Sequence, residues 1–170
     1  MESDRDPDRD PEQSPVTSVA PVTPEPTAGA GGDDRAAPEA TVRPVAFVDS
    51  SALVALVDRD DTSHEAAAAA YRDLVGAGYR LFTTNYVIAE TFDLLRAGPG
   101  IEIARRWLRD SRLAVYHVDE QDEAKARKMA LAPSRGRDLS LTDAISLVVM
   151  DRLGVNDAFA VDQRFLAETA

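Results

Sequence analysis

Four acidic side chains of this 170-residue chain lie in or beside short apolar stretches, namely Asp49, Glu90, Asp143 and Asp162. Carboxylates rarely lie in apolar surroundings unless they are paired, protonated or bound to a metal ion. If the fold brings the four together, we expect their mutual repulsion to raise their pKa values until a divalent cation neutralises them. Because carboxylate oxygens suit hard cations, the pattern predicts a metal-dependent enzyme that uses Mg²⁺ or Mn²⁺.

Composition excludes several other kinds of chemistry. The chain has no cysteine and only two histidines, which excludes disulfides and thiolate metal sites and disfavours a zinc site or a nucleophilic triad. Its net charge of -11 argues against bulk electrostatic binding of nucleic acid, but not against a nuclease with a local basic path. We find neither a signal peptide pattern nor an apolar run of roughly 20 residues, so we expect a cytoplasmic protein with no membrane partner.

The first 43 residues differ from the rest. Eight of the ten prolines lie in residues 1–44, which contain no aromatic residue and carry ten carboxylates against four arginines. Such a segment cannot bury enough apolar surface to offset the entropy lost on ordering. We therefore expect a disordered Pro/Asp-rich tail over 1–43 and a folded domain over 44–170.

Beyond Pro44, short apolar runs alternate with segments of helical periodicity. Strands are predicted at 45–48, 79–83, 113–118 and 158–161. Helices are predicted at 50–57, 62–74, 85–95, 101–109, 120–131 and 140–153, with a short final helix from Gln163. Strands that alternate with helices form parallel sheets covered on both faces. The expected fold is an α/β three-layer α/β/α sandwich with a mainly parallel central sheet.

Polar residues at the helix starts sharpen this prediction. Ser50 or Ser51 is expected to cap the first helix, and Asp119 the helix that begins at residue 120. Thr62 and Glu65 have the spacing of a capping box at the start of the second helix. Either Ser140 or Thr142 is expected to cap the helix predicted at 140–153.

The predicted topology places acidic positions near one another. In such sheets the ligand crevice lies outside the carboxyl ends of the strands. Asp49 and Asp162 end the first and fourth predicted strands, Asp143 lies in the first turn of a helix, and Glu90 lies in the helix after the second strand. Three of the four therefore point to one edge of the sheet. Each also has an ordinary interpretation, since Asp often ends a strand or caps a helix.

Four segments, at 47–56, 83–91, 139–144 and 160–165, resemble in order the four acidic motifs of the PIN-domain ribonucleases, especially VapC-type toxins. The resemblance covers residues 45–168 and leaves out the tail. It implies a PIN-like fold and a Mg²⁺- or Mn²⁺-dependent endoribonuclease that is the toxin of a toxin–antitoxin pair. The metal-binding and catalytic residues would be Asp49, Glu90, Asp143 and Asp162.

The same resemblance has implications for the surroundings of the site. Ser51 and Thr142 match positions of the family that carry small hydroxyl side chains. These hydroxyls would orient the metal-binding carboxylates or water without binding the metal themselves. The family also implies an RNA substrate, a cognate antitoxin protein and a homodimer. Several arginines could contact RNA phosphates, although such residues are more often solvated faces. They are Arg105, Arg106, Arg109, Arg112, Arg135 and Arg137.

Other classes of protein share parts of this sequence pattern. A housekeeping RNA-processing nuclease would have the same site. A haloacid-dehalogenase-like phosphatase or a phospho-receiver domain also begins with a strand ending in Asp, but commonly needs an acidic neighbour and a lysine at a strand end. Here Ser51 stands two residues after Asp49, and both lysines, Lys125 and Lys128, fall within a predicted helix. A non-catalytic interaction module would leave the four carboxylates without a function.

Overall fold

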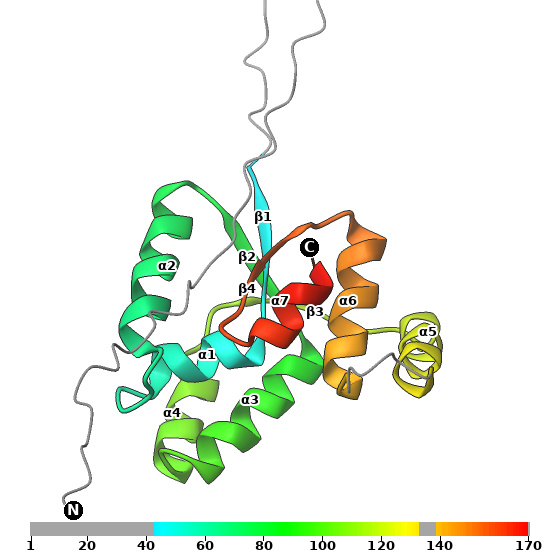
Figure 1. Cartoon of the computed structure of the whole chain (residues 1–170). Helices are drawn as coiled ribbons and strands as arrows, with labels where there is room; N and C mark the ends of the chain where they lie inside the picture. Colours follow the sequence, from blue (N-terminus) through cyan, green and yellow to red (C-terminus); the bar gives the residue numbers. More distant parts are fainter. Residues whose placement is uncertain (1–42, 133–138, 170) are drawn as a thin grey trace, which may run out of the picture.

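The computed structural model describes residues 43–132 and 139–169 (Figure 1). In this part of the chain, four parallel strands form one sheet in the order β3-β2-β1-β4. The strands are β1 (Val45–Val48), β2 (Arg80–Thr84), β3 (Ala114–Tyr116) and β4 (Asp157–Phe159). The predicted parallel sheet is therefore confirmed.

Helices cover the sheet on both sides, with α2 on one side and α5 and α6 on the other (Figure 1). This arrangement confirms the predicted three-layer α/β fold. The helices are α1 (Ser50–Val57), α2 (His64–Gly76), α3 (Asn85–Ala97), α4 (Ile101–Asp110), α5 (Glu120–Leu131), α6 (Leu141–Leu153) and α7 (Gln163–Thr169).

Aromatic side chains tie the central strands to the last helix. Phe47 and Phe82 are in register on β1 and β2, and their rings meet edge to face with centroids 5.5 Å apart. The ring of Phe165 from α7 lies 6.1 Å from that of Phe47. Phe47 and Phe165 are almost completely buried, and a buried side chain of this size stabilises the fold by roughly 1.5–3 kcal/mol. This packing holds α7 against the sheet.

The strand order reverses beside β1. The chain moves from β1 to β2 and β3 in one direction, whereas β4 pairs with the other side of β1. A crevice outside the carboxyl ends of two strands is expected where the order reverses in this way. Here those two strands are β1 and β4, which end just before Asp49 and shortly before Asp162.

The element bounds fall within two residues of those predicted, and the early ends of two strands have identifiable causes. The fourth strand ends at Phe159 rather than at Val161, because the Val161 N–H donates to the Ser51 hydroxyl instead of to a strand. The third strand ends at Tyr116 rather than at 118, and the Val118 N–H donates to the Asn85 side chain.

Two of the predicted helix caps are wrong. Asp49, not Ser50 or Ser51, caps α1, because its extended backbone precedes the first helical residue and its side chain accepts the Ser51 N–H. Helix α2 begins at His64 after Ser63, whose side chain makes no capping bond, so the capping box predicted for Thr62 and Glu65 is absent. The chain turns there around Asp61, which accepts the Ser63 N–H. The caps predicted at Asp119 and Ser140 are confirmed.

Candidate metal-binding active site

Asp49 lies at the carboxyl end of β1, where the buried strand gives way to α1. Its side chain is only 3% exposed. Oδ2 accepts hydrogen bonds from the Ser51 N–H at 2.9 Å and from the Ser51 hydroxyl at 2.6 Å. Oδ1 is buried and has no hydrogen-bond partner in the part of the chain that the structure describes. Burial raises the pKa of Asp49 against the opposing hydrogen bonds of Ser51, and the nearby charge of Asp143 raises it further.

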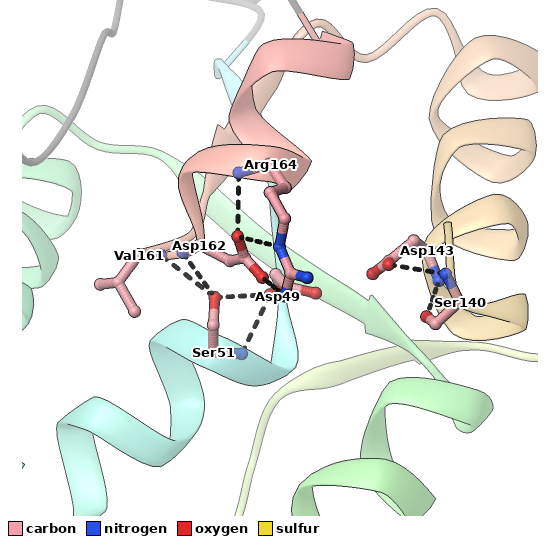
Figure 2. Close-up of polar contacts among 7 residues, drawn as sticks. All are labelled: Asp49, Ser51, Ser140, Asp143, Val161, Asp162 and Arg164. Carbon is pink, nitrogen blue, oxygen red and sulfur yellow. Dashed lines mark hydrogen bonds and ion pairs between the residues drawn. The ribbon is translucent and has the colours of Figure 1, made fainter. Parts of the chain in front are cut away.

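Ser51 joins the ends of β1 and β4. While its hydroxyl donates to Asp49, its oxygen accepts the backbone N–H groups of Val161 at 3.1 Å and Asp162 at 3.2 Å. The Asp49 N–H also donates to the Phe159 carbonyl at 3.0 Å. One hydroxyl therefore fixes both the Asp49 carboxylate and the loop that carries Asp162 (Figure 2). This contact pattern fits the orienting role expected for Ser51.

Glu90 lies on α3, a helix that Thr84 caps at the end of β2. Burial is the largest cause of its raised pKa, and the charges of Asp49 and Asp143 add to the rise. Hydrogen bonds from the side chains of Ser50 and Thr142 oppose that rise. Residues from β1, α3 and α6 thus interact at one place. The predicted position of Thr142 beside a site carboxylate agrees with these interactions, whereas Ser50 was not among the predicted site residues.

Asp143 occupies the third position of α6. Its Oδ2 accepts the Ser140 N–H at 3.1 Å, and its own N–H donates to the Ser140 hydroxyl at 3.0 Å. This reciprocal pair is a capping box. Asp143 therefore has the structural role that its sequence pattern allowed, and it also acts electrostatically on Asp49 and Glu90. Figure 2 shows its carboxylate on α6 facing the group that contains Asp49 and Asp162.

Among the four acidic residues predicted at the site, Asp162 is the one that has a cationic partner in the described part of the chain. Arg164 donates to it through its backbone N–H at 2.8 Å, through Nε at 3.3 Å and through Nη2 at 2.8 Å. Hydrogen bonding to Arg164 lowers the pKa of Asp162. The expectation that repulsion raises the pKa of every site carboxylate is therefore wrong for Asp162. Arg164 lies within the segment 160–165 that resembles the fourth motif, but it was not among the predicted site residues.

The carboxylates are neighbours but do not form a finished metal cage. Within 43–132 and 139–169, no three acidic or histidine side chains stand in a metal-binding arrangement. Asp162 is turned to Arg164 and Asp143 to Ser140, which accounts for this. The residues nevertheless fit a hard divalent cation, because Asp49 offers a buried oxygen that no group in the described part of the chain binds, and the donors are all oxygens.

The predicted RNA-contacting arginines lie in two places. On α4, Arg105 pairs with Glu102 and Arg109 with Asp110. Both pairs are exposed, so their contact with RNA stays a prediction. Arg135 and Arg137 lie outside the described residues.

The chain matches a known protein family over most of its described residues. The family model described as "PIN domain" matches residues 46–169. The chain therefore belongs to the PIN-domain family. This finding overturns two alternatives, the haloacid-dehalogenase-like phosphatase and the phospho-receiver domain, because both belong to other protein families.

Two related proteins indicate which kind of PIN-domain protein this chain is. A VapC ribonuclease of Archaeoglobus fulgidus is 28% identical over 127 residues, which cover 73% of this chain and 81% of that protein. The 23S rRNA-specific endonuclease VapC20 of Mycobacterium tuberculosis is 32% identical over 124 residues, covering 71% of this chain and 92% of the relative. These matches place the chain among the VapC-type ribonucleases.

A solved structure agrees with the sequence relatives. The crystal structure of Mycobacterium tuberculosis VapC20, described as a sarcin–ricin loop cleaving toxin, superposes with a TM-score of 0.62 at 31% identity. The match covers 72% of this chain and 93% of that one. In the described residues, none of the helices is both long and apolar enough to cross a bilayer.

Proposed function

We propose that this VapC-type ribonuclease is a Mg²⁺- or Mn²⁺-dependent toxin that hydrolyses RNA at the acidic edge formed by Asp49, Glu90, Asp143 and Asp162. The observation that carries the proposal is Asp49, which is 3% exposed and has one carboxylate oxygen without a hydrogen-bond partner among the described residues. Such an atom is costly to bury unless a ligand completes its coordination. A divalent cation bound there would supply Lewis acidity for phosphodiester hydrolysis.

Each residue has a separate task in this proposal. Ser51 holds Oδ2 of Asp49, which leaves Oδ1 directed to the cation. Glu90, between the hydroxyls of Ser50 and Thr142, contributes a second carboxylate from α3. Asp143 contributes from the first turn of α6, where the capping box with Ser140 limits its motion. These elements keep the ligands in place before the substrate arrives, which limits reorganisation during the reaction.

The substrate proposed is a structured RNA of the translation machinery. The support comes from the relatives, since VapC20 is named for 23S rRNA and described as cleaving the sarcin–ricin loop. The first RNA to test is therefore 23S rRNA containing that loop. The cell compartment proposed is the cytoplasm, where this RNA is found.

The proposal also includes protein partners. As a toxin, the chain pairs with a cognate antitoxin and acts as a homodimer. Large apolar side chains left exposed on α3 and α4, Leu94 and Leu108, are compatible with such contacts. Expression without an antitoxin should arrest bacterial growth, and Asp49→Asn should relieve that arrest. Normal growth with the soluble wild-type chain present would contradict the toxin assignment.

The direct test is cleavage of total bacterial RNA by the purified chain. We expect wild type and Asp151→Asn to cut RNA with Mn²⁺ and to stop when EDTA is added. Asp151 is a matched control because it is an exposed carboxylate on α6, the helix that also carries Asp143. Asp49→Asn should lose the activity. Cleavage that survives EDTA, or that persists in Asp49→Asn, would contradict the proposed metal site.

A further inference from the structure

Arg164 is the cationic side chain that the structure places at the acidic edge. In the described part of the chain, its ion pair with Asp162 is the one that involves any of the four site carboxylates. Its charge also interacts with that of Asp143. The guanidinium is 85% exposed, whereas the Asp162 side chain is 34% exposed. Arg164 therefore stands at the solvent side of the site, above partly buried carboxylates (Figure 2).

The bonds of Asp162 show what would happen when this carboxylate binds a cation. Both of its oxygens accept hydrogen bonds from Arg164, Oδ1 from the backbone N–H and Nε, and Oδ2 from Nη2. A cation held by Asp162 would compete with the guanidinium for those oxygens. Exposed ion pairs are weak, so the side-chain bonds can open at little cost. The backbone N–H bond can remain and keep the loop in place.

The released guanidinium would match a phosphate. Arginine presents several N–H donors in a planar fork that binds two oxygens of a phosphate at once. An RNA that approaches this edge brings its negatively charged phosphates close to the carboxylates. A carboxylate and a phosphate at short distance repel each other unless a cation lies between them. Two of the predicted arginines of α4, Arg105 and Arg109, are already paired with acidic neighbours on the same helix, Glu102 and Asp110.

We propose that Arg164 binds an RNA phosphate at the active site, with Asp162 holding its side chain in place until RNA arrives. This inference rests on the proposed function, because it requires RNA at the acidic edge. It assigns to Arg164 the task of binding substrate, separate from the cation binding assigned to the carboxylates. Lysine would keep the charge but lose the two-pronged geometry.

RNA binding tests the inference without depending on turnover. The probe is a fluorescently labelled RNA hairpin with the sarcin–ricin loop sequence, titrated by anisotropy with chains that carry Asp49→Asn to prevent cleavage, in excess Mn²⁺. Adding Arg164→Ala should weaken binding about tenfold or more and make log Kd less steep in log salt, by about 0.7–0.9 for one phosphate contact. Arg164→Lys should recover the salt slope but only part of the affinity.

A matched control uses another exposed arginine. Arg72 is exposed on α2, which lies on the opposite side of the sheet from α6 (Figure 1), and Arg72→Ala should change neither affinity nor salt slope. Equal binding with and without Arg164→Ala would overturn the inference and leave Arg164 as a counter-ion only. Equal losses from Arg72→Ala would also overturn it, as a general charge effect.

A cleavage assay separates this failure from failure of the proposed function. If wild type cuts RNA with Mn²⁺ but Arg164→Ala binds the hairpin normally, only the inference falls. If wild type cuts neither the hairpin nor total RNA, the proposed function fails and takes the inference with it. In the otherwise wild-type chain, Arg164→Ala should preserve the rise in melting temperature with Mn²⁺, since Asp162 is then left free to bind the cation.

Discussion

Two buried carboxylates in this protein have opposite surroundings. Asp122 on α5 is fully buried, and both of its oxygens are bonded to Nη1 of Arg152, at 2.9 and 2.8 Å. The Tyr116 hydroxyl donates to it as well, at 2.9 Å. Asp49 is almost as deeply buried, yet it has no cationic partner among the described residues, and one of its oxygens is bonded to nothing there.

The difference separates a structural carboxylate from one kept for a ligand. The bonds of Asp122 join α5 to the end of α6 through Arg152, which also binds Asp119 at 2.7 Å. Hydrogen bonding to Asp119 and Asp122 raises the pKa of Arg152, so its guanidinium stays charged. Asp49 instead accepts hydrogen bonds on one side only, and burial disfavours its charge. Burial alone therefore identifies neither role, whereas the bonding of each oxygen does.

The largest expected effect concerns catalysis. Changing Asp49, Glu90, Asp143 or Asp162 singly to its amide should lower the rate of RNA cleavage with Mn²⁺ on the order of a thousandfold, because a cation ligand is worth several kcal/mol in the transition state. Losses in double variants should be less than additive, since one change already disables the shared centre. Single-turnover cleavage of 23S rRNA measures these rates.

Carboxylates outside the site provide the contrast for that experiment. Asp58→Asn and Asp151→Asn should keep rates close to wild type. Should they lose as much as Asp49→Asn, or should the four site variants keep wild-type rates, the catalytic role of these four residues is wrong.

The second effect concerns stability, for which we expect the change at Asp122 to be more harmful than the change at Asp49. Asp122→Asn should lower the free energy of unfolding by about 2 kcal/mol, because buried charge-assisted hydrogen bonds to Arg152 are lost. Asp49→Asn should leave the metal-free protein equally stable or more stable, because it removes a buried charge. Urea denaturation in EDTA measures both values. Equal destabilisation by the two changes would remove the distinction between the carboxylates.

A smaller effect concerns pH. Because the folded-state pKa of Asp49 is raised, the folded protein binds more protons than the unfolded chain as pH rises past the ordinary value of 3.8, and stability falls. The deficit is fully present above the folded pKa and disappears on acidification. Any stability advantage of Asp49→Asn in EDTA should therefore be largest near pH 7 and shrink toward pH 4. Melting curves at both pH values give the difference, and a constant difference would count against the raised pKa.

The smallest effect concerns the N-terminal segment. Deleting residues 1–43 should shift the melting temperature by no more than about 2 °C and keep RNA cleavage, since their composition offers no aromatic anchor for packing. Circular dichroism melts of the full and shortened chains compare the two directly. A large loss of stability would show that this segment packs on the domain.

Local patterns were sufficient to predict most of the fold. The continuous apolar run Val45–Val48 indicated a strand buried on both faces, and the alternation of strands and helices predicted a parallel sheet. The start of α2 was mispredicted because the turn depends on Asp61 and not on the Thr62–Glu65 spacing. The end of β4 was mispredicted because a residue far away in sequence, Ser51, takes the N–H of Val161.

The site was predictable in part. Motif order predicted the four acidic positions, and the structure brings Asp49, Glu90 and Asp143 within electrostatic reach of one another. The sequence offered no way to see that Asp162 is paired, because a Gln-Arg step after Asp is compatible with many loop conformations. A signal for Arg164 was nevertheless present, as an arginine two residues after a motif carboxylate can bond back to it.

Binding of Mn²⁺ by isothermal titration calorimetry tests the central claim most directly, with RNA absent. Wild type and Asp151→Asn should bind Mn²⁺ with the same affinity and show a higher melting temperature when it is present, by mass action on the folded state. Asp49→Asn should bind it at least about tenfold more weakly, because the lost charge is worth 1.4 kcal/mol or more. Equal affinities for wild type and Asp49→Asn, or no binding by wild type at millimolar Mn²⁺, would contradict the claim that this edge holds the catalytic cation.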